Sequence, residues 1–527
     1  MSSKPCRLSI LILLALLWTT TGAAGQSHRL VPLDSYAYDY IDRLQRRGHL
    51  LSLHPTALPY TYGEVESALD AVDTKTLTGP SRRWFDALTG EFSRDASRRR
   101  TVFGAELQPG ARLSTSPRLD PLRPAFDGEA TLEAGSISVF PNVSGRLFAE
   151  YGPIVAQAGL RFDLFYRDDP DGLAAANRLI TRNEDAYAGI DTRFVSAYVG
   201  RLSHHWAPRG ETGLLISDNP AGYDQLYLRL GSRRFGIRSI LGELDSMTGD
   251  GRFTGAAGAD SVGSSIRRFV SAHRFDWRPS RHVAVSLMES TVYSSATSGL
   301  SLKYLNPLAL HAFAVDGRPK NDENNGILAG MLWLHAGRWT LQGQLLVDDL
   351  DIARTTGEPA AVALSGNVVF AGLERADLGA DLTAVATRTY NTHQPEGRYT
   401  HLLRGLGAPY TDYAQAGAYS TVYFVPWHLD VAVTPRIDVL FQGAGEIHMP
   451  YPDSQDHADT ILLGTVAQVI RPALQLRLQH GRTWWLQLDA GPAFIRNERN
   501  IRSNDRTVFT MTVALTTRLT AGDSVSH

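Results

Sequence analysis

From about Thr101 onward, apolar and polar residues alternate one by one along most of the chain. The pattern is clear in WTLQGQLLVDD, which begins at Trp339, and in WWLQLDAGPAF, which begins at Trp484. In a β-strand this alternation gives one apolar and one polar face. The polar faces carry Gln, Thr, Arg and Asp rather than abundant Lys and Glu, and the segments reach about ten residues, the length that crosses a bilayer at a tilt. The pattern predicts strands with one face in lipid.

A sheet in a membrane must also close on itself. Lipid offers no hydrogen-bonding partner to backbone N–H and C=O groups, so an open sheet edge is excluded there. Counting the alternating segments gives about 18, an even number, as in bacterial single-chain barrels. The predicted fold class is therefore all-β, a closed antiparallel transmembrane β-barrel of about 18 strands over residues 101–520. A C-terminal tail is expected over 521–527.

The direction of the strands can be tested by where the long connections fall. If the last strand, 507–519, runs toward the periplasm, most long connections become extracellular and most short turns periplasmic, as expected. The extracellular connections are predicted near 115–126, 202–222, 246–266, 293–325, 350–362, 391–416, 442–459 and 495–506. A short turn is placed at Phe140, and under this count the long segment that begins at Asp168 falls in the periplasm. It is expected to join a helical bundle there.

The N-terminus has the features of a secretory signal peptide. Lys4 and Arg7 precede an apolar run over 8–18, and small residues follow, so residues 1–24 are predicted to be removed. A membrane anchor is the alternative, but the run is short of the roughly 20 residues that a spanning helix needs. The only cysteine, Cys6, lies in this segment, so disulfides and cysteine metal sites are not expected in the mature chain.

Three short amphipathic helices are predicted between the signal peptide and the strands. The first, in LDSYAYDYIDRLQRRGHL, ends at Gly48; the second begins with Thr61 and Glu64 in capping-box spacing; the third is in SRRWFDALTGEF. Three such helices have little core of their own. Residues 25–100 are therefore expected to form a periplasmic helical bundle that acts as a plug, with a freestanding periplasmic module as the alternative.

Several classes of function find no support in the sequence. The 52 basic and 54 acidic residues form no long single-sign block, so no nucleic-acid partner is expected. No GxSxG elbow, HExxH motif or phosphate loop occurs, and no catalytic residue or cofactor is predicted. His204 and His205 are adjacent and would point to opposite faces of a strand. They are not expected to bind one metal together.

One acidic residue conflicts with a lipid-facing side. Glu289 is in phase with Val283, Val285 and Leu287, and a carboxylate facing lipid is costly. Either a bulge intervenes or this face looks inward, where Arg274 is the predicted partner in a structural ion pair.

Five segments, in order, resemble the Wzi-type capsule assembly proteins of Gram-negative outer membranes. They are YDYIDRLQRRGHL with LPYTYGEVESAL, GRLSHHWAPRGETGLLISDNPA, HRFDWRPSRHVAVSLMESTVY, LNP at Leu305 and LLVDD ending at Asp349. The resemblance covers nearly the whole mature chain. It implies an eighteen-stranded outer-membrane barrel with a periplasmic plug, no open pore, and a role in holding or organising extracellular polysaccharide. Ala207 and Arg209 stand where the family pattern has glycines, so the shape of that loop is expected to differ.

The expected partners are capsular or other surface polysaccharide, outer-membrane lipid and lipopolysaccharide, and the barrel assembly machinery, with the chain acting as a monomer. Sugar rings need flat aromatic faces, and hydroxyls and acidic sugars need amide, carboxylate or guanidinium groups. Two predicted extracellular loops supply both. The candidate residues are Trp206, Arg209, Asp218, Asn219, Tyr223, Arg398, Tyr399, Arg404, Tyr410 and Tyr413.

Two alternatives remain at this point. In a structural interpretation, Asp218 and Asn219 shape a turn before Pro220, and Trp206 packs beneath the loop. In a functional alternative, the chain is a porin or uptake channel for small polar solutes, with the inward Gln, Arg and Asp side chains lining water. Catalysis by Ser, His and Asp at a barrel rim is a third, less favoured hypothesis.

Overall fold

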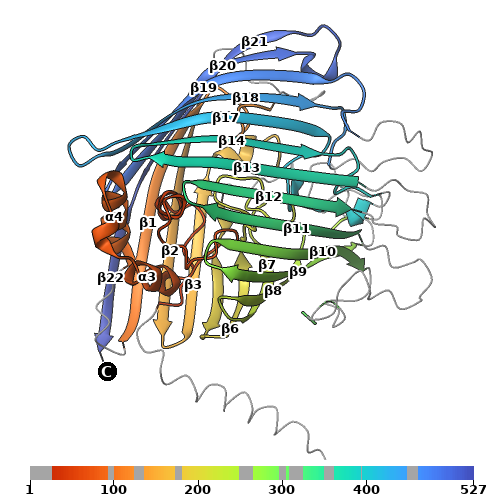
Figure 1. The fold of residues 1–527 in the computed structure, drawn as a ribbon. Helices are drawn as coiled ribbons and strands as arrows, with labels where there is room; N and C mark the ends of the chain where they lie inside the picture. Colours follow the sequence, from red (N-terminus) through yellow and green to blue (C-terminus); the bar gives the residue numbers. More distant parts are fainter. Residues whose placement is uncertain are drawn as a thin grey trace, which may run out of the picture.

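The computed structural model describes residues 27–92, 100–123, 136–172, 181–248, 265–295, 304, 306–307, 325–348, 361–392, 395–447 and 461–526. Long antiparallel strands wrap around a set of short helices (Figure 1). The strands are β1(Arg100–Ser114), β2(Ser138–Tyr151), β3(Ile154–Asp163), β4(Thr181–Asn183), β5(Ala186–Asp191), β6(Val195–Leu202), β7(Tyr223–Gly231), β8(Phe235–Glu243), β9(Arg267–Ser280), β10(Val283–Ser295), β11(Asn325–Ala336), β12(Trp339–Asp348), β13(Ala361–Leu373), β14(Ala376–Val385), β17(Tyr413–Phe424), β18(Asp430–Gln442), β19(Ala467–His480), β20(Trp484–Arg496), β21(Arg506–Thr517) and β22(Leu519–Ser526).

The sheet closes into a barrel because its first strand pairs with its last. Each long strand pairs with the next, and β1 pairs with β2 on one side and with β21 and β22 on the other. β4 adds only three residues beside β3, and β21 and β22 follow one another along the same line. The predicted all-β class and the closed antiparallel barrel of 18 strands are confirmed.

The end of the chain differs from the prediction of a tail over 521–527. β22 continues to Ser526 and pairs with β1, with Ala521 opposite Ala105. The backbone of this segment therefore supplies hydrogen bonds to the first strand instead of leaving its edge open. It is part of the wall.

The two ends of the barrel differ in their connections. At the end we call the turn end, neighbouring strands are joined by short turns, such as 232–234 between β7 and β8 and 337–338 between β11 and β12. At the opposite, loop end lie the long connections, among them 203–222 and 386–412. This is the one-sided distribution that the sequence predicts.

The predicted turn at Phe140 is wrong. This error also placed the segment from Asp168 at the wrong end of the barrel. β2 runs straight through Phe140, and the chain reverses at Gly152, whose φ of +55° suits glycine. Because the strand count is thereby shifted by one, the segment from Asp168 lies at the loop end. Its prediction as part of the helical bundle is wrong; a short helix, α5(Phe165–Asp168), and β4 stand there, and residues 173–180 lie outside the described residues.

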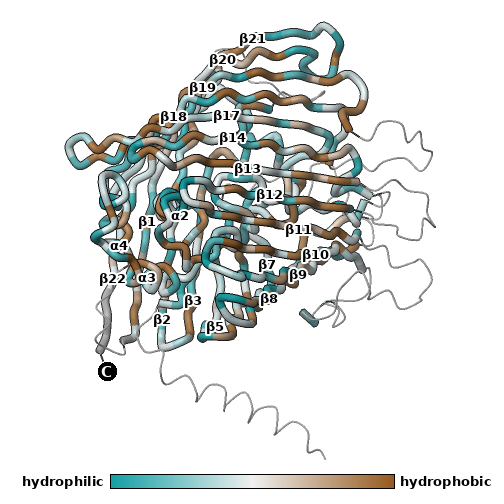
Figure 2. The backbone as a smooth tube through the Cα atoms, viewed as in Figure 1, coloured by the Kyte–Doolittle hydropathy of each residue, from teal (hydrophilic) through white to brown (hydrophobic). Residues whose placement is uncertain are grey.

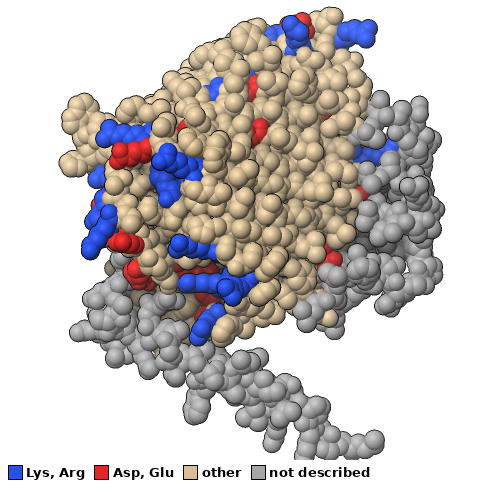
Figure 3. Space-filling view, viewed as in Figure 1, with Lys and Arg blue, Asp and Glu red and all other residues tan. Residues whose placement is uncertain are grey.

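The outer wall carries few charged residues on the face toward the viewer in Figure 3, and hydrophilic and hydrophobic residues alternate along its strands in Figure 2. Leucines such as Leu332 and Leu345 are half or more exposed in mid-strand. Exposed aromatic residues gather at the turn end; they are Phe194, Phe235, Trp277, Trp339, Phe424 and Trp427. Aromatic girdles of this kind mark the membrane interface of transmembrane barrels. Among the described residues, no helix is both long and apolar enough to cross a membrane.

Three helices form the N-terminal domain, residues 27–92, close to the predicted positions. They are α2(Ala37–Arg46), α3(Tyr62–Asp70) and α4(Gly79–Phe92). The predicted capping box is confirmed, since the Thr61 hydroxyl accepts from Glu64 N and the Glu64 carboxylate accepts from Thr61 N. The apolar faces of the helices share one buried cluster with Tyr423 and Ala432 of the barrel wall. The bundle thus completes its core on the strands.

Ion pairs tie this domain to the inside of the wall at widely separated strands. Arg47 Nη2 lies 2.8 Å from the Asp377 carboxylate of β14, and Arg146 of β2 lies 3.0 Å from Asp34. Two further pairs join Asp39 to Arg477 of β19 and Glu64 to Arg229 of β7. The domain is therefore held within the barrel and is not freestanding.

Candidate ligand site in the barrel lumen

The loop 203–222 lies inside the barrel, and its prediction as a surface loop is wrong. It pairs with the N-terminal domain through two backbone hydrogen bonds between His205 and Leu58. On the other side, Gln344 of β12 donates to Thr212 O over 2.7 Å, and the Tyr390 hydroxyl donates to Leu214 O over 2.6 Å. The residues that drive this insertion are apolar; Leu214, Leu215 and Ile216 are almost completely buried. Exposing them at a cell surface would forfeit their burial.

Most of the aromatic residues proposed as sugar platforms have no free ring face. The side chain of Trp206 is 1% exposed and lies beneath the loop, with the Arg274 guanidinium 5.7 Å from its ring centre. Tyr223, Tyr399 and Tyr413 are likewise buried, and the Tyr399 hydroxyl donates to Leu215 O over 3.0 Å. These four rings hold the loops together, as the structural alternative proposed for Trp206, so they are not available to stack on sugars.

Arg398 is also buried and is not among the lining residues of the three cavities described below. Its carbonyl accepts a hydrogen bond from the guanidinium of Arg268, which is fully buried in β9. The second predicted loop is therefore packed in the same way as the first.

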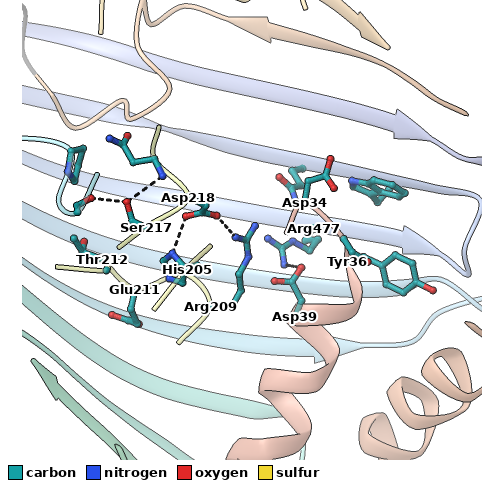
Figure 4. A pocket seen from close by; sticks show the side chains of 18 of the residues that line it. Asp34, Tyr36, Asp39, His205, Arg209, Glu211, Thr212, Ser217, Asp218 and Arg477 are labelled. Atoms are coloured by element: carbon teal, nitrogen blue, oxygen red, sulfur yellow. Dashed lines mark hydrogen bonds and ion pairs between the residues drawn. The ribbon is translucent and has the colours of Figure 1, made fainter. Parts of the chain in front are cut away.

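A cavity of about 470 Å³ lies between α2, the inserted loop and the wall at β19 and β20 (Figure 4). We call it the turn-side cavity, since its wall residues come from the turn-end halves of these strands. Its lining is mainly polar. It consists of Asp34, Ser35, Tyr36, Asp39, His205, Arg209, Gly210, Glu211, Thr212, Gly213, Ser217, Asp218, Asn219, Gly407, Pro409, Arg477, Gln479, Trp485 and Gln487.

Asp218 is the centre of charge pairing in this cavity. Its carboxylate lies 2.7 Å from Arg209 Nη1 and 3.0 Å from His205 Nδ1. Burial opposes ionisation of Asp218, but His205 and Arg209 outweigh it and hold its pKa below the usual range. Asp218 is therefore ionised across the physiological pH range.

Glu211 in the same cavity behaves in the opposite way. Burial, with the Asp381 and Asp42 carboxylates nearby, raises the pKa of Glu211 to about 8. Within the described part of the chain, no cation lies within ion-pair distance of its carboxylate. Glu211 thus carries a proton at neutral pH and can donate a hydrogen bond into the cavity.

A second cavity of about 240 Å³, the loop-side cavity, runs along β1, β2, β3 and β4 toward the loop end. It shares Asp34, Arg209, Asp218 and Asn219 with the turn-side cavity. A third, of about 60 Å³, shares Asn219 and Arg404 with the second and is also lined by Tyr410. The three cavities therefore adjoin one another around Asn219, which lines all of them, and the Arg209–Asp218 pair lies where the first two meet.

Five of the ten predicted binding residues line these cavities: Arg209, Asp218, Asn219, Arg404 and Tyr410. The Arg404 guanidinium lies 2.6 Å from Asp169 and 3.3 Å from Asn219 Oδ1. The structure brings them together because the inserted loop and the loop 386–412 hydrogen-bond along their length, for example from Asn219 Nδ2 to Gly405 O.

The other charged residues that line the two larger cavities were not predicted from the sequence. Arg112, Arg146, Arg161 and Arg477 stand on the polar faces of their strands, so their inward phase was a usable signal. Residues of the N-terminal domain such as Asp34 carried no such signal, because only docking of the domain places them in the lumen.

The predicted pair of Arg274 and Glu289 is not formed. The register places Glu289 opposite His273, whose Nδ1 is 2.9 Å from the carboxylate. Arg274 is one residue further along and points to the other face, where it donates to Asp276 over 2.8 Å and to Thr56 O over 2.6 Å. A shift of one residue changes the face of a strand. Arg274 thus faces the N-terminal domain, whereas Glu289 is buried on the outward face, in phase with Leu287, which is 59% exposed. The predicted inward orientation of the face that carries Glu289 is therefore wrong.

The described residues contain no group of three or more His, Cys, Asp or Glu placed to hold a metal ion. The cavities therefore offer hydrogen-bonding and charged groups from the protein itself.

Comparison with known proteins gives a likeness in fold. No protein-family model matches the chain, and no curated protein matches it. Among solved structures, it is similar to Wzi, described as an outer membrane protein involved in group 1 capsule assembly in Escherichia coli and as a carbohydrate-binding β-barrel. The TM-score is 0.60 at 12% identity, with 93% of this chain and 99% of that chain covered. The predicted resemblance to Wzi is confirmed in the architecture of the barrel.

Two other matches are the Pseudomonas aeruginosa outer membrane proteins OccK8 and opdK. OccK8 gives a TM-score of 0.43 at 9% identity, with 80% of this chain and 98% of that chain covered. For opdK the TM-score is 0.41 at 10% identity, with 80% and 99% covered.

Proposed function

We propose that this chain is an outer-membrane barrel that binds extracellular polysaccharide through the cavities at the loop end of its lumen, without catalysis and without forming an open pore. In bacterial barrels the long loops are extracellular and the short turns periplasmic. With that orientation, the loop-side cavity faces the cell surface and the N-terminal domain faces the periplasm. The carbohydrate binding and capsule assembly named for Wzi are the activities we propose here.

The observation that carries this proposal is the series of polar cavities with paired charges along its walls. Together the two larger cavities, about 470 and 240 Å³, fall in the size range of ligand sites. Guanidinium, carboxylate and amide groups such as Arg404, Asp169 and Asn219 are fixed by each other and present donors and acceptors in set directions. Sugar hydroxyls are recognised by such fixed polar groups.

The proposal also includes the partners that the barrel meets in the membrane. We expect outer-membrane lipid and lipopolysaccharide to contact the apolar wall, the barrel assembly machinery to insert it, and the protein to act as a monomer.

Binding of surface polysaccharides by the refolded full chain in detergent tests the proposal. We expect binding on a glycan array, and at least about tenfold weaker binding when Arg404→Ala and Asn219→Ala are combined, since hydrogen bonds to charged groups contribute about 1.5–3 kcal/mol each. The matched control is Arg267→Ala with Asn497→Ala, at positions outside the three cavities. Absence of binding, or equal loss in both variants, would contradict the proposal.

A diffusion channel for small polar solutes is a second candidate, because the three cavities in the lumen share lining residues and adjoin one another. Planar-bilayer recording separates the two. A channel passes ions in steps, whereas a barrel closed by its N-terminal domain and inserted loop is silent. The Arg209→Ala variant removes the ion pair at the junction of the first two cavities. It is therefore the variant in which an ion current through the lumen would be easiest to detect.

A further inference from the structure

The loop-side cavity is lined by equal numbers of arginines and carboxylates. Six arginines line it, namely Arg112, Arg146, Arg161, Arg182, Arg209 and Arg404, with six carboxylates, namely Asp34, Asp163, Asp169, Glu184, Asp185 and Asp218. Four of the arginines lie within 3.1 Å of a carboxylate oxygen; the pairs are Arg146–Asp34, Arg161–Asp163, Arg209–Asp218 and Arg404–Asp169. The other two, Arg112 and Arg182, have no carboxylate oxygen within that distance among the described residues.

Arg112 is the first of these two. The nearest carboxylate, Asp163, is 3.8 Å away and lies closer to Arg161, at 3.1 Å. Arg112 Nε is buried and has no hydrogen-bonding partner among the described residues. A buried donor without a partner costs free energy, and an incoming acceptor would relieve that cost.

Arg182 is the second. In the part of the chain that the structure describes, no carboxylate lies within ion-pair distance of its guanidinium. The group lies over the ring of Tyr166, 3.8 Å from the ring centre, and the Tyr166 hydroxyl donates to Glu184 over 2.7 Å. Arg182 therefore keeps its in-plane N–H groups free while its flat face is occupied.

Arg112 is held in the same manner. Its guanidinium lies 4.3 Å from the centre of the buried Phe165 ring, and Phe165 is fixed in turn by an edge contact with Phe140, at 5.3 Å between centres. Stacking on an aromatic ring orients a guanidinium and leaves its edge for a planar anion. Arg112, whose nearest carboxylate is 3.8 Å away, and Arg182, which has no carboxylate within ion-pair distance among the described residues, are thus preorganised donors in one cavity.

On these contacts we infer that the loop-side cavity is a subsite for a carboxylate-bearing sugar, that is, a uronic acid residue of the polysaccharide. The inference rests on the proposed function and names the chemistry of its ligand. The edge of a guanidinium matches a carboxylate with two parallel hydrogen bonds. About 240 Å³ suits one small unit of a chain better than a long segment. Four of the six carboxylates lie within 3.1 Å of the other four arginines. The remaining two, Asp185 and Glu184, lie 3.6 Å from Arg146 and 3.8 Å from Arg161.

The experiment is calorimetric titration of the refolded full chain with a galacturonic acid hexamer and with its carboxyl-reduced counterpart, a galactose hexamer. The two probes share their ring stereochemistry and differ in charge. We expect the acid hexamer to bind about 10- to 100-fold more tightly, the factor for a hydrogen bond to a charged group, and this preference to weaken with added salt. Combined Arg112→Gln and Arg182→Gln should abolish the preference while both hexamers still bind.

Arg267→Gln is the matched control, since Arg267 forms an exposed pair with Glu243 at 2.8 Å outside the cavities; it should keep the preference. If the double variant does not refold, Arg182→Gln alone, on the short β4, should reduce the preference. Equal binding of both hexamers by the unmodified chain overturns the uronic acid subsite and leaves polysaccharide binding standing. Binding of neither overturns both. A competition titration compares inorganic phosphate with galacturonate as displacers of the acid hexamer. If phosphate displaces the hexamer at a lower concentration than galacturonate does, the cavity is a phosphate site and the assignment is overturned.

Discussion

Removing the Asp377 carboxylate is expected to weaken the attachment of the N-terminal domain to the wall. Asp377 of β14 has no exposed side-chain surface and accepts from Arg47 Nη2 at 2.8 Å and from the Tyr423 hydroxyl at 2.7 Å. The Arg47 side chain is itself only 8% exposed. In an Asp377→Ala variant, Arg47 becomes a buried cation without its partner.

Breaking a buried ion pair from one side costs about 3–5 kcal/mol. The matched control is Asp224→Ala, because Asp224 pairs with Arg201 at 2.6 Å while its side chain is 62% exposed. Exposed pairs contribute about 0–1 kcal/mol. The two variants make the same substitution in a barrel strand and differ in the burial of the pair that is lost.

The assay is urea unfolding of the refolded protein in phospholipid vesicles, followed by tryptophan fluorescence. The midpoint should fall strongly for Asp377→Ala and little for Asp224→Ala. In planar bilayers Asp377→Ala should stay closed, because the pairs of Asp34 and Asp39 with the wall remain. Similar small shifts in both variants would refute the reasoning that buried pairs anchor the domain.

Burial and charge lead to three other predictions. Leu332→Arg, at an outward mid-strand position that is 50% exposed, should destabilise the barrel in vesicles by about 2–4 kcal/mol, whereas Leu332→Ala should not; equal refolding of both would contradict a lipid-facing wall. Trp206→Ala should lower the free energy of unfolding by about 3–5 kcal/mol, and Trp427→Ala, at 93% exposure, should leave it nearly unchanged; the reverse order would mean that Trp206 is not packed. Because the pKa of Glu211 is raised from 4.5 to about 8, the folded chain keeps a proton that the unfolded chain loses, so stability should fall between pH 4.5 and 8 and level off above. Glu211→Gln should remove this fall and become the more stable protein above pH 8, as urea unfolding at pH 5 and 9 would show; parallel pH profiles would disprove it.

The interior polar residues were only partly accessible to sequence reasoning. The polar faces of the strands were predicted to point inward, and on β7 Gln225 and Arg229 do so, since Leu226 between them is exposed. The partner of Arg229 was not predicted, because this partner, Glu64, belongs to the N-terminal domain. Phase gives the face of a strand, but it does not say what is packed against that face.

The Glu289 position shows the same limit. The sequence indicated correctly that its carboxylate could not face lipid alone, yet the predicted partner was Arg274. The register of β9 and β10 decides the pairing, and a one-residue difference cannot be read from alternation within each strand.

The sequence by itself determined the wall of this protein, since the period-two alternation and the demand of lipid for satisfied backbone groups leave a closed barrel as the solution. It also located the three helices and the capping box at Thr61, because helix starts are set by local hydrogen bonds. Only the tertiary structure decided that the loop 203–222 enters the lumen and that Asp34, Arg112 and Arg209 meet around shared cavities. These contacts join segments far apart in the chain, and the free energy that selects them comes from burial of Leu214 and its neighbours against partners that no local pattern identifies.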